Sequence, residues 1–443
     1  MGGVRVASAR YVAEAVVTCD ESGTVHEPGA VEVEGARITW VGPAEGAPPP
    51  AEGTAETRLP GLLMPGFVDV HCHTPMTLFR GASEDVALDR FLREILWPRE
   101  AKLTDDDVFW GMTLGCAEHL RGGTTTTCEM YVFEDAIVEA VRAAGSRCVL
   151  TPGVIEAPGW DYIGPWSERL DAVLSFRDHL GDSAETIEVG IAAHAAYTLP
   201  LEALEAIGAA AHERGALVHI HVAETEGEGR ELEEQHGKSV PALLGELGFL
   251  DGRVLAAHGV WLTEDDRRLF AERDVAVAHC PTANAKLASG IAPLADLRRR
   301  GIRVGLGTDS PAANNDFDMW EELRLAAFFA RATTLDPEVL PAGEVLALAT
   351  RGGAEALGRD DLGVLAPDKA ADFVHVRTDD AAFVPRVEER DLVSHLVWAG
   401  TSRHVADVWV AGVQVVEDGR CTTVDVERAR AEVQERATRV ARS

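Results

Sequence analysis

The chain has 443 residues, of which 46% are hydrophobic and 26% charged, values typical of globular proteins. This composition excludes collagen, a coiled coil and wholesale disorder, and the length allows one long barrel with attached pieces. Seventy-three Asp and Glu oppose 41 Lys and Arg, so the formal net charge is −32. We therefore expect no nucleic-acid partner, because such affinity comes largely from cations that neutralise phosphates.

Cysteine usage and the N-terminus indicate the compartment. The seven cysteines are odd in number and form no C-x-x-C pair, which is typical of a reduced environment. The first twenty residues lack the apolar segment of a signal peptide, and no run approaches the ~18 apolar residues of a membrane helix. We predict a soluble cytoplasmic protein without a membrane partner. The sequence does not determine the oligomeric state, and a homo-oligomer is one of the alternatives.

The first flank, residues 1–62, contains short alternating runs with turn residues, such as residues 31–42 with the turn EGAR. These patterns predict β-hairpins. The other flank, residues 363–443, has a similar run from residue 405 with the turn AGVQ, and then a polar helix from Asp425 onward. Neither flank can bury a comfortable core alone. We expect both chain ends to build one small β-sandwich, the second part carrying the C-terminal helix.

Between the flanks, one theme repeats eight times: a short apolar, β-branched run followed by a helical stretch. The eight runs are residues 66–73, 124–130, 147–154, 187–194, 217–224, 254–260, 275–281 and 303–310. Segments 200–215 and 263–274 have helical periodicity, and Thr263 is a predicted N-cap. Eight such units predict an α/β fold with a closed parallel (β/α)8 TIM-type barrel over residues 63–362.

Polar side chains gather where the predicted barrel strands end, which is the active face of such barrels. The residues are His71, His73, His194, His219, His221, Glu224, His258, His279 and Asp309. A single histidine is more often a satisfied core residue. Six strand ends that carry His or an acid instead indicate a site.

A metal centre follows from four of these residues. His71 and His73 lie two apart, so on a strand they share one face and can converge on one ion. His221 and Asp309 would complete a set of three imidazoles and one carboxylate, which suits one divalent metal, Zn(II) first and Fe(II) as the alternative. The competing interpretation is a buried polar network in which protein partners satisfy every group.

Glu224 follows His221 by three residues, so it lies beyond the end of a regular strand, where the loop turns inward. A partly desolvated carboxyl group beside a metal can transfer protons near neutral pH. The alternative is a surface glutamate, because five further glutamates follow within ten residues. No dinucleotide fingerprint, P-loop or nucleophile elbow occurs, and the H-x-E with P-C-x-x-C signature of the other zinc deaminases is absent.

The segments that carry these residues resemble the metal-dependent amidohydrolase superfamily over nearly the whole chain. The landmarks are PGFVDVHCH from Pro65, VHIHVAET from Val218, AHGV from Ala257, HCPTANAKLASG from His279 and GLGTDSPAANN from Gly305. Within it, HTPMTLFRGASED from His73, WPRE from Trp97 and the pair Met130–Tyr131 look most like 5′-methylthioadenosine/S-adenosylhomocysteine deaminases and related chlorohydrolases.

This resemblance implies an activity and roles for individual residues. His71, His73, His221 and Asp309 would bind the metal, Glu224 and His258 would handle protons, and Glu100 and His194 would contact the substrate. We expect hydrolytic deamination of an amino-purine nucleoside such as adenosine, 5′-deoxyadenosine or 5′-methylthioadenosine. Asp309 would take the proton that water releases. Glu224 would protonate the purine ring and would therefore also contact the substrate.

One departure concerns the 5′ group of the substrate. Relatives that accept S-adenosylhomocysteine place an arginine after the third strand, where this chain reads Leu150-Thr-Pro152-Gly153. Proline cannot pair with a carboxylate, so we expect the loop with Trp160 and Trp166 to wall a pocket for a less charged group. The alternatives are an s-triazine chlorohydrolase or a guanine, pterin or cytosine aminohydrolase on the same scaffold, and more remotely an inactive ligand-binding scaffold.

Overall fold

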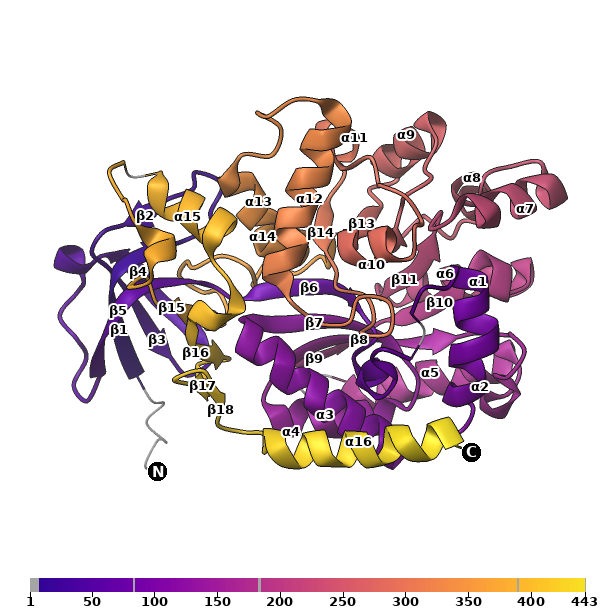
Figure 1. Cartoon of the computed structure of the whole chain (residues 1–443), viewed down its shortest axis with the longest axis horizontal. Coiled ribbons are helices and arrows are strands. Elements are labelled where there is room, and N and C mark those ends of the chain that lie inside the picture. The colour runs from indigo at the N-terminus through magenta and orange to yellow at the C-terminus, as the bar shows by residue number, and fades with distance from the viewer. Residues whose placement is uncertain (1–7, 83, 182–184, 389, 443) are drawn as a thin grey trace.

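The computed structural model describes residues 8–442 except 83, 182–184 and 389. The chain forms two parts, a barrel surrounded by helices and a separate β-sheet in which both ends of the chain meet (Figure 1). The predicted fold class is confirmed.

The barrel strands are all parallel and follow the eight predicted runs. Their order is β14-β13-β12-β11-β10-β8-β7-β6, with β9 paired to β8. Gly190 separates β9 from β10, so the fourth predicted run is split. The bounds are β6 (Phe67–Cys72), β7 (Thr124–Tyr131), β8 (Arg147–Val154), β9 (Ile187–Val189), β10 (Ile191–Ala195), β11 (Leu217–Val222), β12 (Arg253–His258), β13 (Ala276–His279) and β14 (Val304–Leu306).

The ring closes between β6 and β14, just past the carboxyl end of β14. The Asp309 N–H donates to the His71 carbonyl at 2.9 Å, the His73 N–H donates to the Asp309 carbonyl at 3.3 Å, and Cys72 forms a parallel bridge with Asp309. These backbone bonds place Asp309 beside His71 and His73, although more than 230 residues separate them in sequence.

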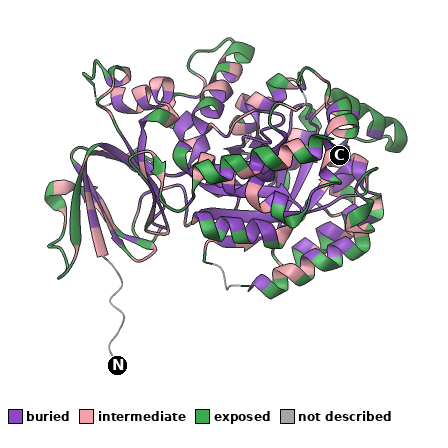
Figure 2. Ribbon diagram, turned by 60° about the horizontal axis from the view of Figure 1, so that its bottom comes forward, coloured by how far each residue is buried: buried purple, intermediate pink, exposed green. Residues whose placement is uncertain are grey.

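The strands are buried on both faces, as their continuous apolar sequences predict (Figure 2). Val70, Val149, Leu255 and Ala278 belong to one buried cluster, together with residues of and just after α14 (Arg351–Ala356). A packed interior of this kind leaves the carboxyl ends of the strands as the place for polar groups.

The chain ends share one hydrogen-bonded sheet of nine strands. Its order is β18-β17-β16-β15-β5-β1-β3-β4, with β2 on β1, and Tyr11, Phe373 and Trp409 pack together within it. The bounds are β1 (Ser8–Val17), β2 (Val25–His26), β3 (Gly29–Glu34), β4 (Arg37–Pro43), β5 (Ala55–Pro65), β15 (Phe373–Val376), β16 (Val405–Val410), β17 (Val413–Glu417) and β18 (Arg420–Cys421). Because β5 runs to Pro65, sheet and barrel share a continuous stretch of chain; the division into 1–62, 63–362 and 363–443 stays a proposal.

Helices cover the outside of the barrel. The N-cap predicted at Thr263 is present as a capping box with Asp266. The further α-helices are α1 (Leu88–Arg90), α2 (Trp97–Glu100), α3 (Asp105–Gly122), α4 (Glu134–Ala144), α5 (Trp166–Leu180), α6 (Leu201–Glu213), α7 (Glu226–His236), α8 (Val240–Glu246), α9 (Glu264–Glu272), α10 (Pro281–Lys286), α11 (Leu294–Arg299), α12 (Met319–Thr334), α13 (Ala342–Ala349), α15 (Asp391–Ala399) and α16 (Val426–Arg442).

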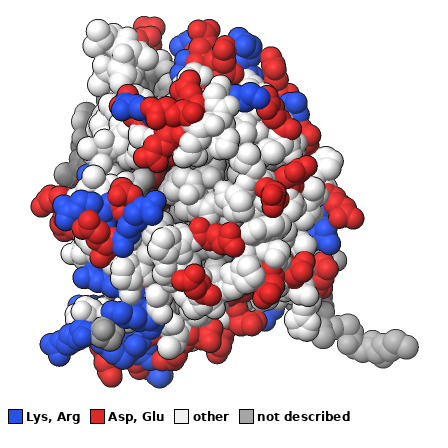
Figure 3. All heavy atoms as spheres, turned by 90° about the vertical axis from the view of Figure 1, so that its right-hand side faces the viewer, with Lys and Arg blue, Asp and Glu red and all other residues white. Residues whose placement is uncertain are grey.

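The C-terminal helix α16 returns to the barrel and packs on α3 (Figure 1). Arg436 and Arg439 on α16 pair with Asp106 and Asp107 at the start of α3. Acidic side chains are spread over the face seen in Figure 3, with large uncharged areas between them. All seven thiols are free. Within the described residues, no helix is long and apolar enough to cross a bilayer.

Candidate active site

Four predicted ligands meet at the carboxyl ends of the strands. Nε2 of His221 lies 3.4 Å from Nε2 of His73, and Oδ1 of Asp309 lies 3.4 Å from Nε2 of His73 and 3.7 Å from Nε2 of His71. Bonds of about 2.0–2.1 Å to one cation would separate tetrahedral ligands by similar distances. His71, His73 and His221 form one of the groups that could hold a metal ion.

The ring nitrogens that face away from this point are occupied by protein partners. Nδ1 of His73 donates to the Met130 carbonyl at 2.6 Å, and Nδ1 of His221 donates to the His194 carbonyl at 2.7 Å. These bonds fix the tautomer that leaves the Nε2 lone pair free for a metal. Nε2 of His71 is buried and has no hydrogen-bond partner. A buried nitrogen without a hydrogen-bond partner that faces a carboxylate is the arrangement expected of a metal ligand, so the donor set fits a divalent cation.

His71 is oriented by a relay through the barrel interior. Its Nδ1 lies 3.0 Å from Nε2 of His219, and Nδ1 of His219 lies 3.1 Å from Oγ1 of Thr151. The Thr151 hydroxyl in turn donates to the Glu129 carbonyl at 3.0 Å. The sequence predicted His219 on the fifth strand but assigned it no role. Its spacing of two from His221, which puts both side chains on one face of the strand, could have indicated one.

Burial controls the titration of these groups. It lowers the pKa of His73 to about 4 and holds the pKa of His71 and of His221 well below the usual value, and neighbouring imidazoles add to the effect at all three. The hydrogen bonds of His73 to the Met130 carbonyl and of His221 to the His194 carbonyl oppose it. The pKa of Asp309 is raised by burial to about 7. Neutral imidazoles are the form that binds metals.

Glu224 and His258 stand beside the four ligands. β11 ends at Val222, Ala223 adopts a positive φ of 52°, and Glu224 is buried, as predicted for a residue past the strand end rather than on the surface. Its carboxyl Oε2 lies 3.8 Å from Nε2 of His258, and burial raises its pKa to about 8. Nδ1 of His258 donates to Oδ1 of Asn284 at 2.9 Å, which directs Nε2 toward Glu224. Sequence reasoning missed Asn284.

The backbone at this face is strained in several places. His258 has φ 74° and Asp309 has φ 60°, values uncommon for residues other than glycine. Such conformations cost on the order of 1–3 kcal/mol each and cluster at functional sites. His258 and Asp309 are two of the nine residues that the strand-end pattern selected.

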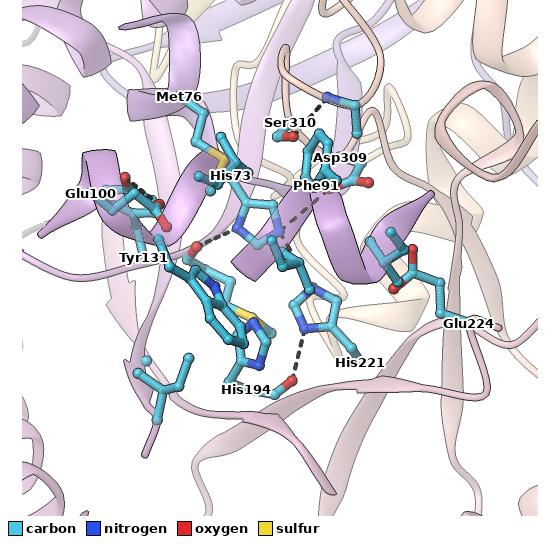
Figure 4. A pocket seen from close by; sticks show the side chains of 18 of the residues that line it. His73, Met76, Phe91, Glu100, Tyr131, His194, His221, Glu224, Asp309 and Ser310 are labelled. Carbon is cyan, nitrogen blue, oxygen red and sulfur yellow. Dashed lines mark hydrogen bonds and ion pairs between the residues drawn. The ribbon is translucent and has the colours of Figure 1, made fainter. Parts of the chain in front are cut away.

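A pocket with about 730 Å³ of open space lies against three of the four ligands, His73, His221 and Asp309, while His71 is buried beneath them. Its walls are largely apolar, with Met76, Phe91, Trp97 and Ile155 among the lining residues. In Figure 4, Glu100 and Tyr131 lie on one side of His73 and His221, and Glu224 lies on the other. The pocket therefore connects the proposed metal face with a second polar group.

Glu100 is that second group. It ends a helical segment made of α1, a π-helical turn (Phe91–Leu96) and α2. The Tyr131 hydroxyl donates to its Oε1 at 2.8 Å, and burial raises the pKa of Glu100 to about 7. A π-turn of this kind is frequent at functional sites.

His194 also lines the pocket. Strand pairing shifts between Ala193 and Ala195, so His194 is the bulged residue of β10. Its Nδ1 lies 3.1 Å from the Thr198 hydroxyl, which donates to the Ala195 carbonyl, so Nδ1 is the donor and Nε2 an acceptor.

The aromatic loop divides between pocket and exterior. Trp160 is buried and lines the pocket. Trp166 begins α5 and is not among the lining residues, so the prediction that it walls the pocket is wrong; helix formation at residue 166 turns it away. Neither Lys nor Arg lines the pocket in the described part of the chain. Arg169, behind Gly153, is paired with Glu134.

A second group of potential ligands is buried between β6, which carries Asp69 and Cys72, and α3, which carries His119. Asp69 already accepts hydrogen bonds from the N–H groups of His71 and Thr308 and from the Thr308 hydroxyl. These bonds tie the end of β6 to the segment after β14, so we interpret this group as support for the ring closure.

A parallel barrel with three imidazoles and a carboxylate at its carboxyl face defines a metal-dependent hydrolase class. The sequence profile described as "Amidohydrolase family" matches residues 62–415. The chain belongs to the amidohydrolase family.

Curated relatives and solved structures agree with this membership. A 5-methylthioadenosine/S-adenosylhomocysteine deaminase of Desulfitobacterium hafniense is 39% identical over 93% of this chain and 94% of its own length. A 5′-deoxyadenosine deaminase of Methanothermobacter thermautotrophicus is 39% identical over 84% and 87%. The crystal structure of a zinc-bound adenosine deaminase from Xanthomonas campestris matches with a TM-score of 0.92 and 33% identity, covering 99% of both chains.

Proposed function

We propose that this protein is a metal-dependent hydrolytic deaminase of an amino-purine nucleoside, which releases ammonia. The observation that carries the proposal is the geometry of one pocket. Four ligand atoms converge at one end, and a buried carboxyl group, Glu100, stands on the far side. The names of the relatives support the same class of substrate.

His71, His73, His221 and Asp309 would hold one divalent cation, Zn(II) by preference. When bound, such a cation supplies Lewis acidity, which lowers the pKa of water toward about 7. The bound zinc in the Xanthomonas structure supports this choice, and Fe(II) accepts the same ligands.

The protein's own groups would then move the protons. The Asp309 carboxyl accepts a proton from the attacking water. Nε2 of His258 stabilises the attacking oxygen by accepting a hydrogen bond from its other O–H, because Nδ1 carries the ring proton. Glu224, whose raised pKa keeps it protonated near neutral pH, donates to the ring nitrogen beside the carbon under attack. The ring carbon gains an oxygen and loses its amine, which leaves as ammonia after a second proton transfer.

Glu100 and His194 would hold the nucleoside. A carboxylate accepts hydrogen bonds from two vicinal hydroxyls, so Glu100 suits a ribose, and Tyr131 holds it in place. The acceptor Nε2 of His194 faces a pocket whose apolar walls suit the purine ring.

The 5′ group is expected to be neutral. Pro152 in β8 stands where an arginine would serve a carboxylate, and Arg169, which donates to the Gly153 carbonyl of the same strand, is already paired with Glu134. Adenosine, 5′-deoxyadenosine and 5′-methylthioadenosine should therefore be better substrates than S-adenosylhomocysteine.

The test is a screen for ammonia release by the zinc-loaded protein. We expect adenosine, 5′-deoxyadenosine or 5′-methylthioadenosine to be converted, and S-adenosylhomocysteine to have the lowest kcat/KM of the four. Guanine, a pterin and cytosine complete the panel for ammonia release, and a chloro-s-triazine is tested by its release of chloride. Turnover of one of these without any nucleoside would overturn the proposal, and so would a fully zinc-loaded protein that releases no ammonia.

An s-triazine substrate is the second candidate, since the pocket walls are mostly apolar. An atrazine chlorohydrolase from Arthrobacter aurescens complexed with zinc matches with a TM-score of 0.87 and 26% identity over 97% of this chain and all of its own. The buried Glu100–Tyr131 pair favours a nucleoside, because a triazine offers no vicinal hydroxyls to it.

A further inference from the structure

Glu228 lies in α7, four residues after the proposed proton donor Glu224, and it is buried although the other glutamates of the helix are exposed. α7 is a polar helix, and Glu226, Glu231 and Glu234 are exposed, whereas Glu228 retains only 8% of its exposure. A carboxyl group is rarely buried unless its oxygens are used. Oε1 of Glu228 has no hydrogen-bond partner among the described residues, so the bond made by Oε2 is the contact to explain.

The Glu228 carboxyl is bound to the backbone of the segment that carries Glu224. Oε2 of Glu228 accepts a hydrogen bond from the Glu224 N–H at 3.2 Å, while the Glu228 N–H donates to Oγ1 of Thr225, the N-cap, at 3.2 Å. In an ordinary capping box the third helical residue would bind the N–H of the cap itself. Here Oε2 binds the N–H of the residue before the cap.

This segment needs such support. Ala223 has φ 52°, in the left-handed region that residues with a side chain seldom adopt. On its other side the segment is held by the Trp261 N–H, which donates to the Ala223 carbonyl at 2.9 Å. Two hydrogen bonds therefore hold the turn: one from the Trp261 N–H in the loop after β12, and one to the Glu228 carboxyl group.

The Glu224 carboxyl group is paired with Nε2 of His258 at 3.8 Å, which is beyond hydrogen-bond distance. The position of its carboxyl group therefore depends on the backbone at residues 223–225.

We infer that Glu228 is a positioning residue: its carboxyl oxygen fixes the turn at residues 223–225 and thereby places the Glu224 side chain at the pocket wall. The inference rests on the proposed function for the role of Glu224, but the structural effect can be measured without turnover. A misplacement of about 1 Å in a reacting group can cost about 10²-fold in rate.

The experiment compares Glu228→Ala, Glu228→Gln and the control Glu234→Ala in zinc-loaded protein. Gln keeps an acceptor oxygen of the same reach, whereas Ala removes it. We expect Glu228→Ala to lower kcat by about 10- to 100-fold with KM and zinc content little changed. Glu228→Gln should restore most of the rate, and the control should match the wild type.

Amide hydrogen exchange of the peptide that spans residues 222–226 gives the second readout. We expect faster exchange in Glu228→Ala and unchanged exchange in Glu228→Gln. Wild-type exchange in Glu228→Ala would overturn the inference whether or not a substrate is known, and so would equal loss of kcat in both Glu228 variants. Failure of the proposed function would instead appear as a wild-type protein that deaminates no nucleoside.

Discussion

Buried polar groups of the terminal sheet and of the barrel mouth follow different rules. In the sheet, His375 uses both ring nitrogens, since Nδ1 lies 2.6 Å from Asp407 and Nε2 binds the Pro60 carbonyl. Arg147 of the barrel makes two bonds to Asp372 at the edge of the sheet, at 2.6 and 3.0 Å. Each of these groups is satisfied by the protein.

In the barrel mouth, His71, His73 and His221 each use Nδ1 and leave Nε2 without a donor or acceptor among the described residues to satisfy it. Nε2 of His71 and of His73 faces the Asp309 carboxylate, and Nε2 of His221 faces Nε2 of His73. Burying polar groups without partners costs free energy, so a protein retains such an arrangement where a ligand completes it. The difference between the two regions shows how a structural histidine can be told from a metal ligand. A structural histidine has protein partners at both ring nitrogens, whereas a metal ligand keeps one ring nitrogen free and directed at the other ligands.

The sharpest way to break this comparison is to remove one group from each region. Asp309→Ala should lose its zinc and lower turnover by more than the ~10²–10⁴ that proton transfer alone contributes. His375→Gln should lower the melting temperature but keep zinc and kcat. Zinc analysis and ammonia release on both proteins check the prediction. Loss of zinc from the His375 variant would contradict it.

Glu224→Gln should come next in size. It removes the proton donor but no proposed ligand, so kcat should fall by about 10²–10⁴ while zinc content stays unchanged. Steady-state kinetics and metal analysis on the same sample test this. Turnover at the wild-type rate would exclude Glu224 as the donor.

In metal-free protein, the Glu224→Gln variant also tests whether burial raises the pKa of the Glu224 carboxyl group. The pKa of Glu224 is raised from 4.5 to about 8 by burial, so between these values the folded state keeps a proton that the unfolded state releases. Stability from this group is present below pH 4.5 and is lost as pH rises toward 8. The melting temperature of the wild type relative to Glu224→Gln should fall across that window; a constant difference would contradict the burial.

His219→Gln should have a smaller effect on the metal site. It interrupts the relay that orients His71, so zinc should bind about 10–100-fold more weakly. His212→Gln, at an exposed position of α6, is the control. Competition with a chelator of known affinity measures both proteins, and equal affinities would show that the relay does not orient His71.

Arg147→Met should have the least effect on turnover. It leaves Asp372 buried without its partner, a change that costs about 3–5 kcal/mol in stability. Chemical denaturation should show this loss, while kcat per folded molecule stays unchanged. A loss of activity at full folding would show that sheet and site are coupled.

The sequence predicted much of this site because its signals are local. The spacing of His71 and His73, the strand ends and the offset of Glu224 all follow from strand geometry, and each was found where expected. The β-rich flanks were predicted from alternation and turn residues, and the structure joins them in one sheet.

Other features depend on tertiary contacts that no local pattern carries. The bridge that brings Asp309 to Cys72, the bulge at His194 and the choice of ring nitrogen arise only when distant strands pair. In the sequence, Glu228 cannot be told from the surface glutamates around it. Only the structure shows that its carboxyl group accepts a hydrogen bond from the Glu224 N–H. Trp166 was misplaced because the start of α5 was not predicted.

The central claim is that three imidazoles and one aspartate surround a single cation. Crystals of zinc-loaded protein measured at the zinc absorption edge would test it most directly. We predict one anomalous peak per chain, within about 2.0–2.2 Å of Nε2 of His71, His73 and His221 and of Asp309. A peak elsewhere, or zinc-loaded crystals without a peak at these residues, would contradict the account.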